Sequence, residues 1–536
     1  MAEGKKAKLG GACDVVIIGA GNGGLAAALA LAVRGAKPLV LEQHNAPGGF
    51  ATSFVRGRFE FEAALHELSS IGPENNKGGV RRFLEDEGGV DIDWVPIPEA
   101  YRVILTDSGM DARLPFGEAP FIDAIEEKVP GSREPLTRYF ALCREVSGAL
   151  GLLAKTASNP SPKRIIKDLK KFVAESADPF DDARRNTSNV VTFLRTLPKT
   201  VDEVTLKMGI PPKAVDLLYP YWCYLGIPMS RMNFTIWAAM LIDYIDYGAW
   251  IPRLRSQEMS YAIEARVREL GGRVEYNTRV DRVLVERGRV KGVVTASGET
   301  IKTSAVIANT SPTQLYGSLV SPASESPAAA LRNVNSRKLG GAGFVVYLGL
   351  DVSPVELGVN DYGYFISKTM DTDAVYGSME KLDLVDMQAT ICLNNAIPDC
   401  SPPGTTIISM TTLYKPGVWD SVKPKEYAAL KNRIADAMIT QFDDALGTDI
   451  RSRVEEIEVA TPATFARYAR SFNGGIYGYE LDPWDSIIPR ILSEKDESYI
   501  KGLEVAGGFA TMGHGFSSSL ISGRSAGLKT LAGLGG

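Results

Sequence analysis

The stretch Asp14-Val-Val-Ile-Ile-Gly19-Ala-Gly21-Asn-Gly-Gly24 decides the fold of this chain. Its run of valine and isoleucine predicts a short, fully buried strand, and its glycines follow with the spacing Gly-x-Gly-x-x-Gly. The alanine- and leucine-rich residues 25–34 predict a helix, which Gly35 ends. A second buried strand follows in Lys37-Pro-Leu-Val-Leu-Glu42. A strand, a helix and a strand within about 30 residues make one parallel βαβ unit.

Each glycine of this turn has a distinct task in a dinucleotide site. Gly19 permits the tight turn, Gly21 lets a pyrophosphate approach the backbone, and Gly24 allows close helix–strand packing. The helix N-terminus offers free N–H groups and a partial positive charge to the pyrophosphate. Glu42 ends the second strand about 20 residues later, where a carboxylate accepts hydrogen bonds from ribose hydroxyls and repels a 2′-phosphate. The pattern therefore predicts a dinucleotide site, because a purely structural glycine turn would leave Glu42 unexplained.

Composition and length place the chain among large globular proteins. It has 536 residues, of which 45% are hydrophobic and 23% charged. This length exceeds one ordinary core, so we expect two lobes built from interleaved segments. The formal net charge is -5 without a Lys/Arg-rich block, which gives no support to nucleic-acid binding. The histidines and cysteines are few and lack a Cys-x-x-Cys pair, so we expect no metal site and a reducing, cytoplasmic setting.

Two apolar stretches resemble membrane spans in their composition. Residues 15–33 carry the glycine pattern, and residues 232–251 contain Asp243 and Asp246, whose charges are costly inside a bilayer. We therefore expect neither stretch to span a membrane. The aromatic and aliphatic residues 219–251 allow three interpretations: a buried core helix, the apolar wall of a substrate tunnel, or a patch in peripheral contact with a membrane.

The middle of the chain predicts a return to the first sheet. After a region of helices and loops expected at about residues 91–250, a helix is predicted at residues 259–270 and a buried strand at residues 305–309. Short strands separated by turns lie between them, at residues 273–276, 280–286, 290–295 and 299–302.

The later part predicts a second mixed region and a final strand and helix. Residues 316–489 are expected to add strands and one helix, at residues 424–446. A strand is predicted at residues 503–506, and a helix of small residues from about Ser517 onward.

Two passages bear on which dinucleotide binds. Pro47-Gly48-Gly49-Phe50 follows Glu42, and Gly502-Leu-Glu-Val-Ala-Gly507-Gly508 precedes Gly513-His-Gly515-Phe516 late in the chain. They resemble the glutathione-reductase-type FAD proteins, in which a Gly-Gly pair follows the ribose-binding acid. The resemblance implies FAD as the cofactor. It also implies that the last helix points its N-terminus at the flavin, where its dipole favours negative charge on the reduced ring.

Four passages narrow the resemblance to the phytoene desaturase-like family, which includes carotenoid isomerases and retinol saturase. They are Gly48-Gly49-Phe50 through Phe59-Glu-Phe61-Glu62-Ala-Ala-Leu-His66, residues 249–309, Ala460-Thr-Pro-Ala-Thr-Phe-Ala-Arg-Tyr468 with Asn473-Gly-Gly-Ile-Tyr477-Gly478, and the late glycine segment. The third passage favours the isomerase and saturase side. Ala64, where the family often has glycine, and His514, in a stretch often rich in glycine and proline, depart from the pattern. They leave the flavin contacts and the reaction direction open.

The resemblance implies an α/β fold, with a glutathione-reductase-type FAD-binding Rossmann domain and an interleaved mixed-sheet and helical substrate domain. The FAD-binding domain would take residues 1–90, 251–315 and 490–536, and the substrate domain residues 91–250 and 316–489. By the same resemblance, Val280 would contact the adenine end through its backbone and Asn309 would lie beside the cofactor. The residues implied to bind FAD are Gly19, Gly21, Gly24, Glu42, Gly49, Phe50, His66, Val280, Asn309, Gly507, Gly508, Gly515, Phe516 and Ser517.

A flavin accepts or donates a hydride, so the protein must place a C–C or C=C bond over the ring and exclude water. A long apolar substrate needs an apolar tunnel. Residues 219–250 and Tyr477-Gly-Tyr479 are candidates to line it, although core packing explains them equally well. Saturation of a double bond also needs a proton donor. The candidates, on resemblance and position alone, are His66, His514, Tyr477, Glu67 and Tyr479.

The leading hypothesis is an FAD-dependent oxidoreductase that desaturates, saturates or isomerises an apolar isoprenoid- or polyene-like small molecule. A flavin amine oxidase would share the cofactor fold and release peroxide as it oxidises amines. Reduced FAD could instead serve a non-redox isomerase, and a prenyl-binding GDP-dissociation inhibitor would share the architecture without flavin chemistry. No second strand-flanked Gly-x-Gly-x-x-Gly occurs in the sequence, so we expect a separate electron donor or acceptor.

Overall fold

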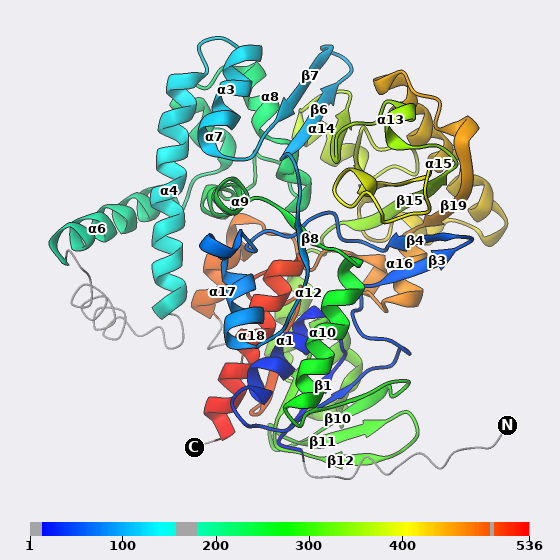
Figure 1. Ribbon diagram of the computed structural model, residues 1–536. Helices are drawn as coiled ribbons and strands as arrows, with labels where there is room; N and C mark the ends of the chain where they lie inside the picture. Colours follow the sequence, from blue (N-terminus) through cyan, green and yellow to red (C-terminus); the bar gives the residue numbers. More distant parts are fainter. Residues whose placement is uncertain (1–12, 157–178, 494–497, 535–536) are drawn as a thin grey trace.

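The computed structural model describes residues 13–156, 179–493 and 498–534. In these residues the chain forms three main sheets, of five, four and seven strands. Figure 1 shows the two smaller sheets together at one end of the molecule. The seven-stranded sheet and a group of helices lie side by side at the other end.

The five-stranded sheet is parallel, in the order β20-β13-β1-β2-β9. Its strands are β1 (Val15–Ile18), β2 (Pro38–Leu41), β9 (Arg273–Glu275), β13 (Val306–Ala308) and β20 (Leu503–Val505). Helix α1 (Asn22–Ala32) is buried along its whole length between this sheet, α10 (Arg255–Glu269) and α18 (Phe516–Leu534). The predicted βαβ unit and the predicted return of a strand at residues 305–309 are therefore present, and the strand predicted at residues 503–506 joins the same sheet.

The four-stranded sheet extends the same end of the molecule. It consists of β10 (Val280–Glu286), β11 (Arg289–Thr295), β12 (Thr300–Lys302) and β14 (Val320–Ser321). The first three strands are antiparallel neighbours, as the turns between them predict, and β14 runs parallel to β10. Helix α12 (Ala328–Ser336) packs on the same apolar cluster through Ala330 and Val334. Segments beyond residue 315 therefore contact the dinucleotide side.

The seven-stranded sheet forms the floor of the other lobe. Its order is β19-β15-β18-β17-β16-β6-β7, and only the β6–β16 pair is parallel. The strands are β6 (Tyr101–Leu105), β7 (Met110–Leu114), β15 (Ala342–Leu350), β16 (Gly363–Ser367), β17 (Met387–Cys392), β18 (Thr406–Tyr414) and β19 (Val454–Ala460). Helix α15 (Pro424–Leu446) covers it with its buried face.

A group of helices stands beside this sheet (Figure 1). It contains α3 (Glu118–Lys128), α4 (Arg133–Thr156), α6 (Pro179–Thr196), α7 (Val201–Met208), α8 (Pro212–Leu218) and α9 (Phe234–Tyr247). Two short pairs connect the lobes: β3 (Ser53–Arg56) with β4 (Phe59–Glu62), and β5 (Trp94–Pro96) with β8 (Trp250–Pro252). None of the described helices is long and apolar enough to cross a membrane.

Two predictions about these regions are wrong. Residues 316–489 contain several helices besides α15, among them α12, α13 (Pro354–Leu357), α14 (Thr372–Ser378), α16 (Pro462–Tyr468) and α17 (Ile487–Ser493). These helices are short, so one or two turns show no clear helical period in the sequence. Residues 91–250, expected to be helices and loops, also supply β5, β6 and β7 to sheets whose other strands lie far away in sequence.

Candidate functional site

One large cavity passes from the turn after β1 to helices α4 and α9. Its volume is about 2100 Å³, compared with about 300–1,000 Å³ for an ordinary ligand pocket. The end between the parallel sheet and α18 is called the groove below, and the end lined by α4, α9 and the seven-stranded sheet is called the chamber. The cavity has room for a dinucleotide and a second long molecule at once.

The glycine turn has the geometry that its sequence predicts. Gly19 has a φ of 90°, a conformation that glycine adopts without strain. A Cβ atom on Gly24 would collide with the carbonyl oxygen of Gly19, so the helix can approach the strand only with glycine there. The first hydrogen bond of α1 runs from Leu25 N–H to the Gly21 carbonyl, at 2.9 Å. The preceding N–H groups have no partner within the helix and remain available to an anion.

Glu42 ties this turn to the loop after β2. Its Oε2 accepts a hydrogen bond from Ala20 N–H at 2.6 Å, and its Oε1 accepts one from His44 N–H at 2.7 Å. The side chain is nearly buried, yet it lines the groove. Each carboxylate oxygen has a second acceptor site, so Glu42 can also accept hydrogen bonds from ribose hydroxyls.

Asn309 joins the early and late glycine segments. Its backbone N–H donates to the Ile18 carbonyl at 2.9 Å. Its side-chain amide fills the space that Cβ atoms on Gly21, Gly23 or Gly507 would need. The glycines therefore allow three distant segments to meet at one amide.

Helix α18 brings a second N-terminus to the groove. Gly507 N–H donates to Ser522 Oγ at 2.8 Å, and a Cβ on Gly523 would collide with the carbonyl oxygen of Gly23. The close crossing of α1 and α18 places both helix starts on the cavity wall. Two partial positive charges therefore lie where a dinucleotide would carry its phosphates and its flavin.

All but one of the predicted cofactor residues line the cavity. The lining includes Gly19, Gly21, Glu42, Gly49, Phe50, His66, Val280, Asn309, Gly507, Gly508, Gly515, Phe516 and Ser517. The exception is Gly24, whose role is the close packing described above. Ser517 Oγ donates to the Ser69 carbonyl at 2.9 Å, which fixes the start of α18 against the chamber.

Two buried acceptor atoms on the cavity wall lack hydrogen-bond partners in the protein and could be satisfied by a bound dinucleotide. Asn22 Oδ1 and His514 Nδ1 lie on lining residues and have no hydrogen-bond partner. The Nε2 atom of His514 lies 3.2 Å from the Tyr224 carbonyl, so Nε2 carries the proton and Nδ1 is an acceptor. A bound group with N–H or O–H donors would satisfy such acceptors. The lining therefore fits a dinucleotide.

His514 and Tyr477, both predicted as acid candidates, lie together. Their rings stack at 4.1 Å, and Tyr477 O–H donates to the Cys223 carbonyl at 2.6 Å. Burial lowers the pKa of His514 to about 4, with a smaller contribution from the charge of Arg490. Burial raises the pKa of Tyr477 well above its usual value. Both groups are therefore neutral at pH 7, and carbonyl groups already accept their donor hydrogens.

His66 lies on the other side of Tyr224, at the sheet. Its Nε2 is 2.9 Å from Thr411 Oγ1 on β18, and its ring centroid is 6.0 Å from that of Tyr224. Burial lowers the pKa of His66 to about 4, so this histidine is neutral at pH 7 as well. Tyr479, a further candidate, is fully buried and does not line the cavity.

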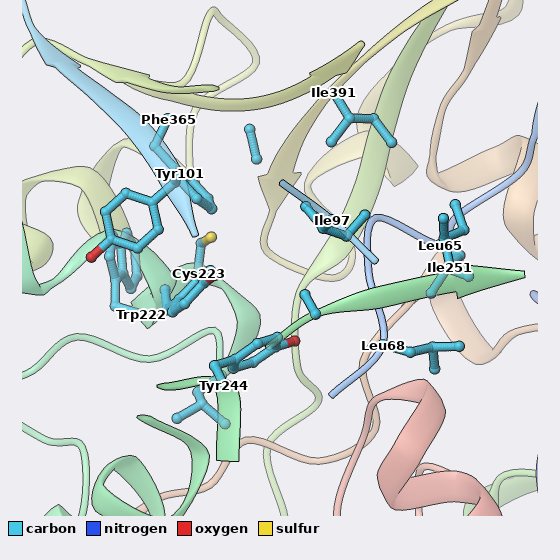
Figure 2. Packing of buried hydrophobic residues seen from close by; sticks show 14 of the residues in the cluster. Leu65, Leu68, Ile97, Tyr101, Trp222, Cys223, Tyr244, Ile251, Phe365 and Ile391 are labelled. Carbon is cyan, nitrogen blue, oxygen red and sulfur yellow. The ribbon is translucent and has the colours of Figure 1, made fainter. Parts of the chain in front are cut away.

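Some residues of the aromatic segment 219–251 line the chamber, and others pack in the core. Helix α9 presents one face to the chamber, with the spacing of a helix: Ile236, Ala239, Met240, Asp243 and Tyr244. Tyr219, Tyr221, Trp222 and Trp237 instead pack in the core. Figure 2 shows Trp222, Cys223 and Tyr244 packed together with Tyr101 and Phe365.

Asp243 is a chamber residue whose role the sequence did not reveal. Its carboxylate accepts a hydrogen bond from Ser70 Oγ at 2.6 Å, and burial raises its pKa. The sequence marks it only as a charge within an apolar stretch, which argues against a membrane span but does not indicate a site. Tyr347 and Thr411 also line the chamber from β15 and β18, and no local pattern marks them.

Comparisons with known proteins agree with this geometry. A family model described as an NAD(P)-binding Rossmann-like domain matches residues 17–86. All-trans-retinol 13,14-reductase of Danio rerio is 24% identical over 520 residues, which cover 92% of this chain and 82% of that protein. Chloroplastic prolycopene isomerase of Daucus carota is 23% identical over 472 residues, which cover 87% of this chain and 71% of that protein.

Solved structures show the same fold. An oxidoreductase from Methanosarcina mazei has a TM-score of 0.59 at 17% identity, covering 96% of this chain and 99% of its own. Putrescine oxidase bound to putrescine has a TM-score of 0.59 at 14% identity, covering 97% and 99%. At this identity the likeness concerns the fold alone. The predicted fold class and the resemblance to the phytoene desaturase-like family are confirmed, and the Rossmann-like family model supports a dinucleotide cofactor.

Proposed function

We propose that this chain is an FAD-dependent oxidoreductase that acts on C–C or C=C bonds of an apolar, polyene- or isoprenoid-like small molecule. One observation carries the proposal: a single cavity joins a dinucleotide groove to a chamber with largely apolar walls. A flavin in the groove would then lie next to a substrate in the chamber.

The groove residues divide the binding of FAD among them. The turn at Gly19 and the start of α1 would hold the pyrophosphate, Glu42 the ribose, and the start of α18 the flavin. FAD supplies a ring that accepts or donates a hydride. The protein's part is to hold the reacting bond in place and keep water away from it.

The chamber and the named relatives both favour a polyene-like substrate. Leu150, Leu225, Ile236 and Met240 provide apolar lining. The relatives are named for a reduction of retinol and an isomerisation of prolycopene. Electrons would come from or go to a separate partner, because the sequence holds one strand-flanked Gly-x-Gly-x-x-Gly and no second.

The experiment is purification followed by an absorbance spectrum and an anaerobic reaction. The wild-type protein should show flavin bands, and after reduction by dithionite it should be reoxidised by all-trans-retinol with loss of a double bond. If retinol is isomerised and the flavin is not reoxidised, the reaction is an isomerisation and not a net reduction. A colourless protein that takes up no FAD, or one that reacts only with amines, would overturn the proposal.

A further inference from the structure

One acidic side chain of the chamber lacks any countercharge. Glu67 lines the cavity between Leu65 and Leu68, which are each only 1% exposed. Figure 2 shows these two leucines across from Tyr244 and Cys223. The Oε1 atom of Glu67 is buried and has no hydrogen-bond partner. A carboxylate in this position would hold an unpaired negative charge in apolar surroundings, which is costly.

The titratable groups around Glu67 are neutral or acidic. The charge of Glu99 raises the pKa of Glu67. A charge on Glu67 in turn raises the pKa values of Tyr101, Tyr221, Cys223, Tyr224, Tyr244 and Tyr362. The adjacent His66 is neutral at pH 7. No lysine or arginine is among these groups.

Burial is the dominant influence on the acidity of Glu67. It raises the pKa of this carboxyl to about 8, and the charge of Glu99 acts in the same direction. The nearby hydroxyls of Tyr221 and Tyr224 favour the carboxylate but do not offset the burial. At pH 7 most of Glu67 therefore carries its proton.

The other acid candidates have their donors engaged. Tyr477 donates to the Cys223 carbonyl, and His514 donates to the Tyr224 carbonyl. Asp243 also lines the chamber, but its carboxylate is held by Ser70 Oγ. Unlike the donor hydrogens of Tyr477 and His514, a proton on the buried Oε1 of Glu67 has no acceptor in the protein.

We propose that Glu67, as an uncharged carboxylic acid, donates the proton that completes saturation of a C=C bond in the chamber. This inference rests on the proposed function. The O–H bond of Glu67 breaks, a C–H bond forms on one carbon, and Glu67 becomes a carboxylate. The other carbon receives a hydride with both electrons, which reduced flavin supplies as it is oxidised. The carboxylate then recovers a proton from water.

The first test measures reoxidation of dithionite-reduced protein by all-trans-retinol in a single anaerobic turnover. Glu67→Gln keeps the size of the side chain and removes the acid, so reoxidation should slow by about 100-fold or more. Its flavin spectrum should match the wild type. The matched control is Glu127→Gln, which changes an exposed glutamate of α3 outside the cavity and should stay within about twofold of the wild-type rate. In D2O, both carbons of the saturated bond in the wild-type product should carry deuterium, because the transferred hydrogen of reduced flavin exchanges with solvent as the carboxyl proton does.

The second test follows the carboxyl itself, without turnover. At pH 7 the infrared C=O band of protonated carboxylic acids should lose the contribution of Glu67 in Glu67→Gln, whereas Glu127→Gln should leave the band unchanged. Because the folded pKa of Glu67 lies above its unfolded value, folding loses stability as pH rises from about 4.5 to about 8. Glu67→Gln removes that loss, so its unfolding temperature should exceed the wild type at pH 9 and approach it at pH 5.

The outcomes separate the inference from the function beneath it. Wild-type turnover by Glu67→Gln, or an ionised Glu67 at pH 7, would overturn the role of Glu67 and leave the proposed function standing. A wild-type protein that binds flavin but leaves retinol unchanged would overturn both.

Discussion

The groove and the chamber of the same cavity are built in different ways. The groove is made of backbone turns, glycines and two helix starts, and nearly all of its contacts lie within short recognisable segments. The chamber is made of side chains from α4, α9, β15 and β18, which only tertiary packing brings together. The cofactor groove can therefore be recognised from short sequence segments, whereas the residues of the substrate chamber are scattered along the sequence.

The groove and the chamber also differ in the charges that they present to a ligand. The groove offers partial positive charge from the starts of α1 and α18, and its carboxylate, Glu42, is held by two backbone N–H groups. The chamber holds carboxyl groups with raised pKa values and histidines with lowered ones. The groove thus suits a charged ligand, and the chamber suits an uncharged one.

The largest effect is expected from a single methyl group in the groove. Gly24→Ala would force its Cβ against the Gly19 carbonyl, so α1 must move away from β1. We expect loss of all bound flavin and a fall of about 3 kcal/mol in the free energy of unfolding. The flavin-to-protein absorbance ratio and denaturant unfolding measure these.

The control for this change is Gly377→Ala. Gly377 is exposed on α14, and no atom lies within 4 Å of a Cβ built there. This variant should bind flavin like the wild type. Normal flavin content in Gly24→Ala would show that the groove tolerates a side chain at this glycine. The groove would then not depend on close backbone packing, as the comparison with the chamber requires.

The next effect concerns His514, which lies where the groove and chamber meet. Its pKa is about 4 in the folded protein and about 6.5 in the unfolded chain. Since the unfolded state binds the proton more tightly, stability should fall as pH drops from 6.5 to 4, by about 3 kcal/mol for this residue. His514→Gln should reduce that loss by the same amount, measured as unfolding free energies at pH 7 and pH 4. An unchanged pH dependence would mean that His514 is reached by water.

The smallest effect tests the apolar wall of the chamber. Ala239→Trp would place a large ring among the lining residues of α9. We expect kcat/KM for all-trans-retinol to fall by about tenfold while the flavin spectrum stays unchanged. Ala429→Trp, on the exposed face of α15, is the matched control and should behave as the wild type. Equal activity in the two variants would place the substrate elsewhere.

Local pattern was enough for the βαβ unit and the late glycine segment. The predicted strand and helix positions there agree with β1, α1, β2 and β20 to within a few residues. Strand β1 lies between Asp14 and Gly19, strand β2 lies between Lys37 and Glu42, and both strands are apolar throughout. Such signals need no knowledge of distant parts of the chain.

Long-range contacts account for much of what was missed. Helix α10 begins at Arg255, four residues before its predicted start, because Glu62 accepts hydrogen bonds from Ser256 N–H and Ser256 Oγ at 2.8 and 2.7 Å. Strand β6 pairs with β16, which lies more than 250 residues later. The orphaned oxygen of Glu67 likewise depends on what surrounds it, so the sequence could name the residue but not its state.

The contact between α1 and α18 can form only after nearly the whole chain has been synthesised. Roughly 490 residues separate the starts of the two helices, so at about 5–20 residues per second the second helix emerges about 25–100 s after the first. During that interval a helix that is buried along its whole length must wait without its partner. The nascent protein should therefore depend on chaperones, and ribosome-bound chains that stop short of residue 516 should take up no flavin.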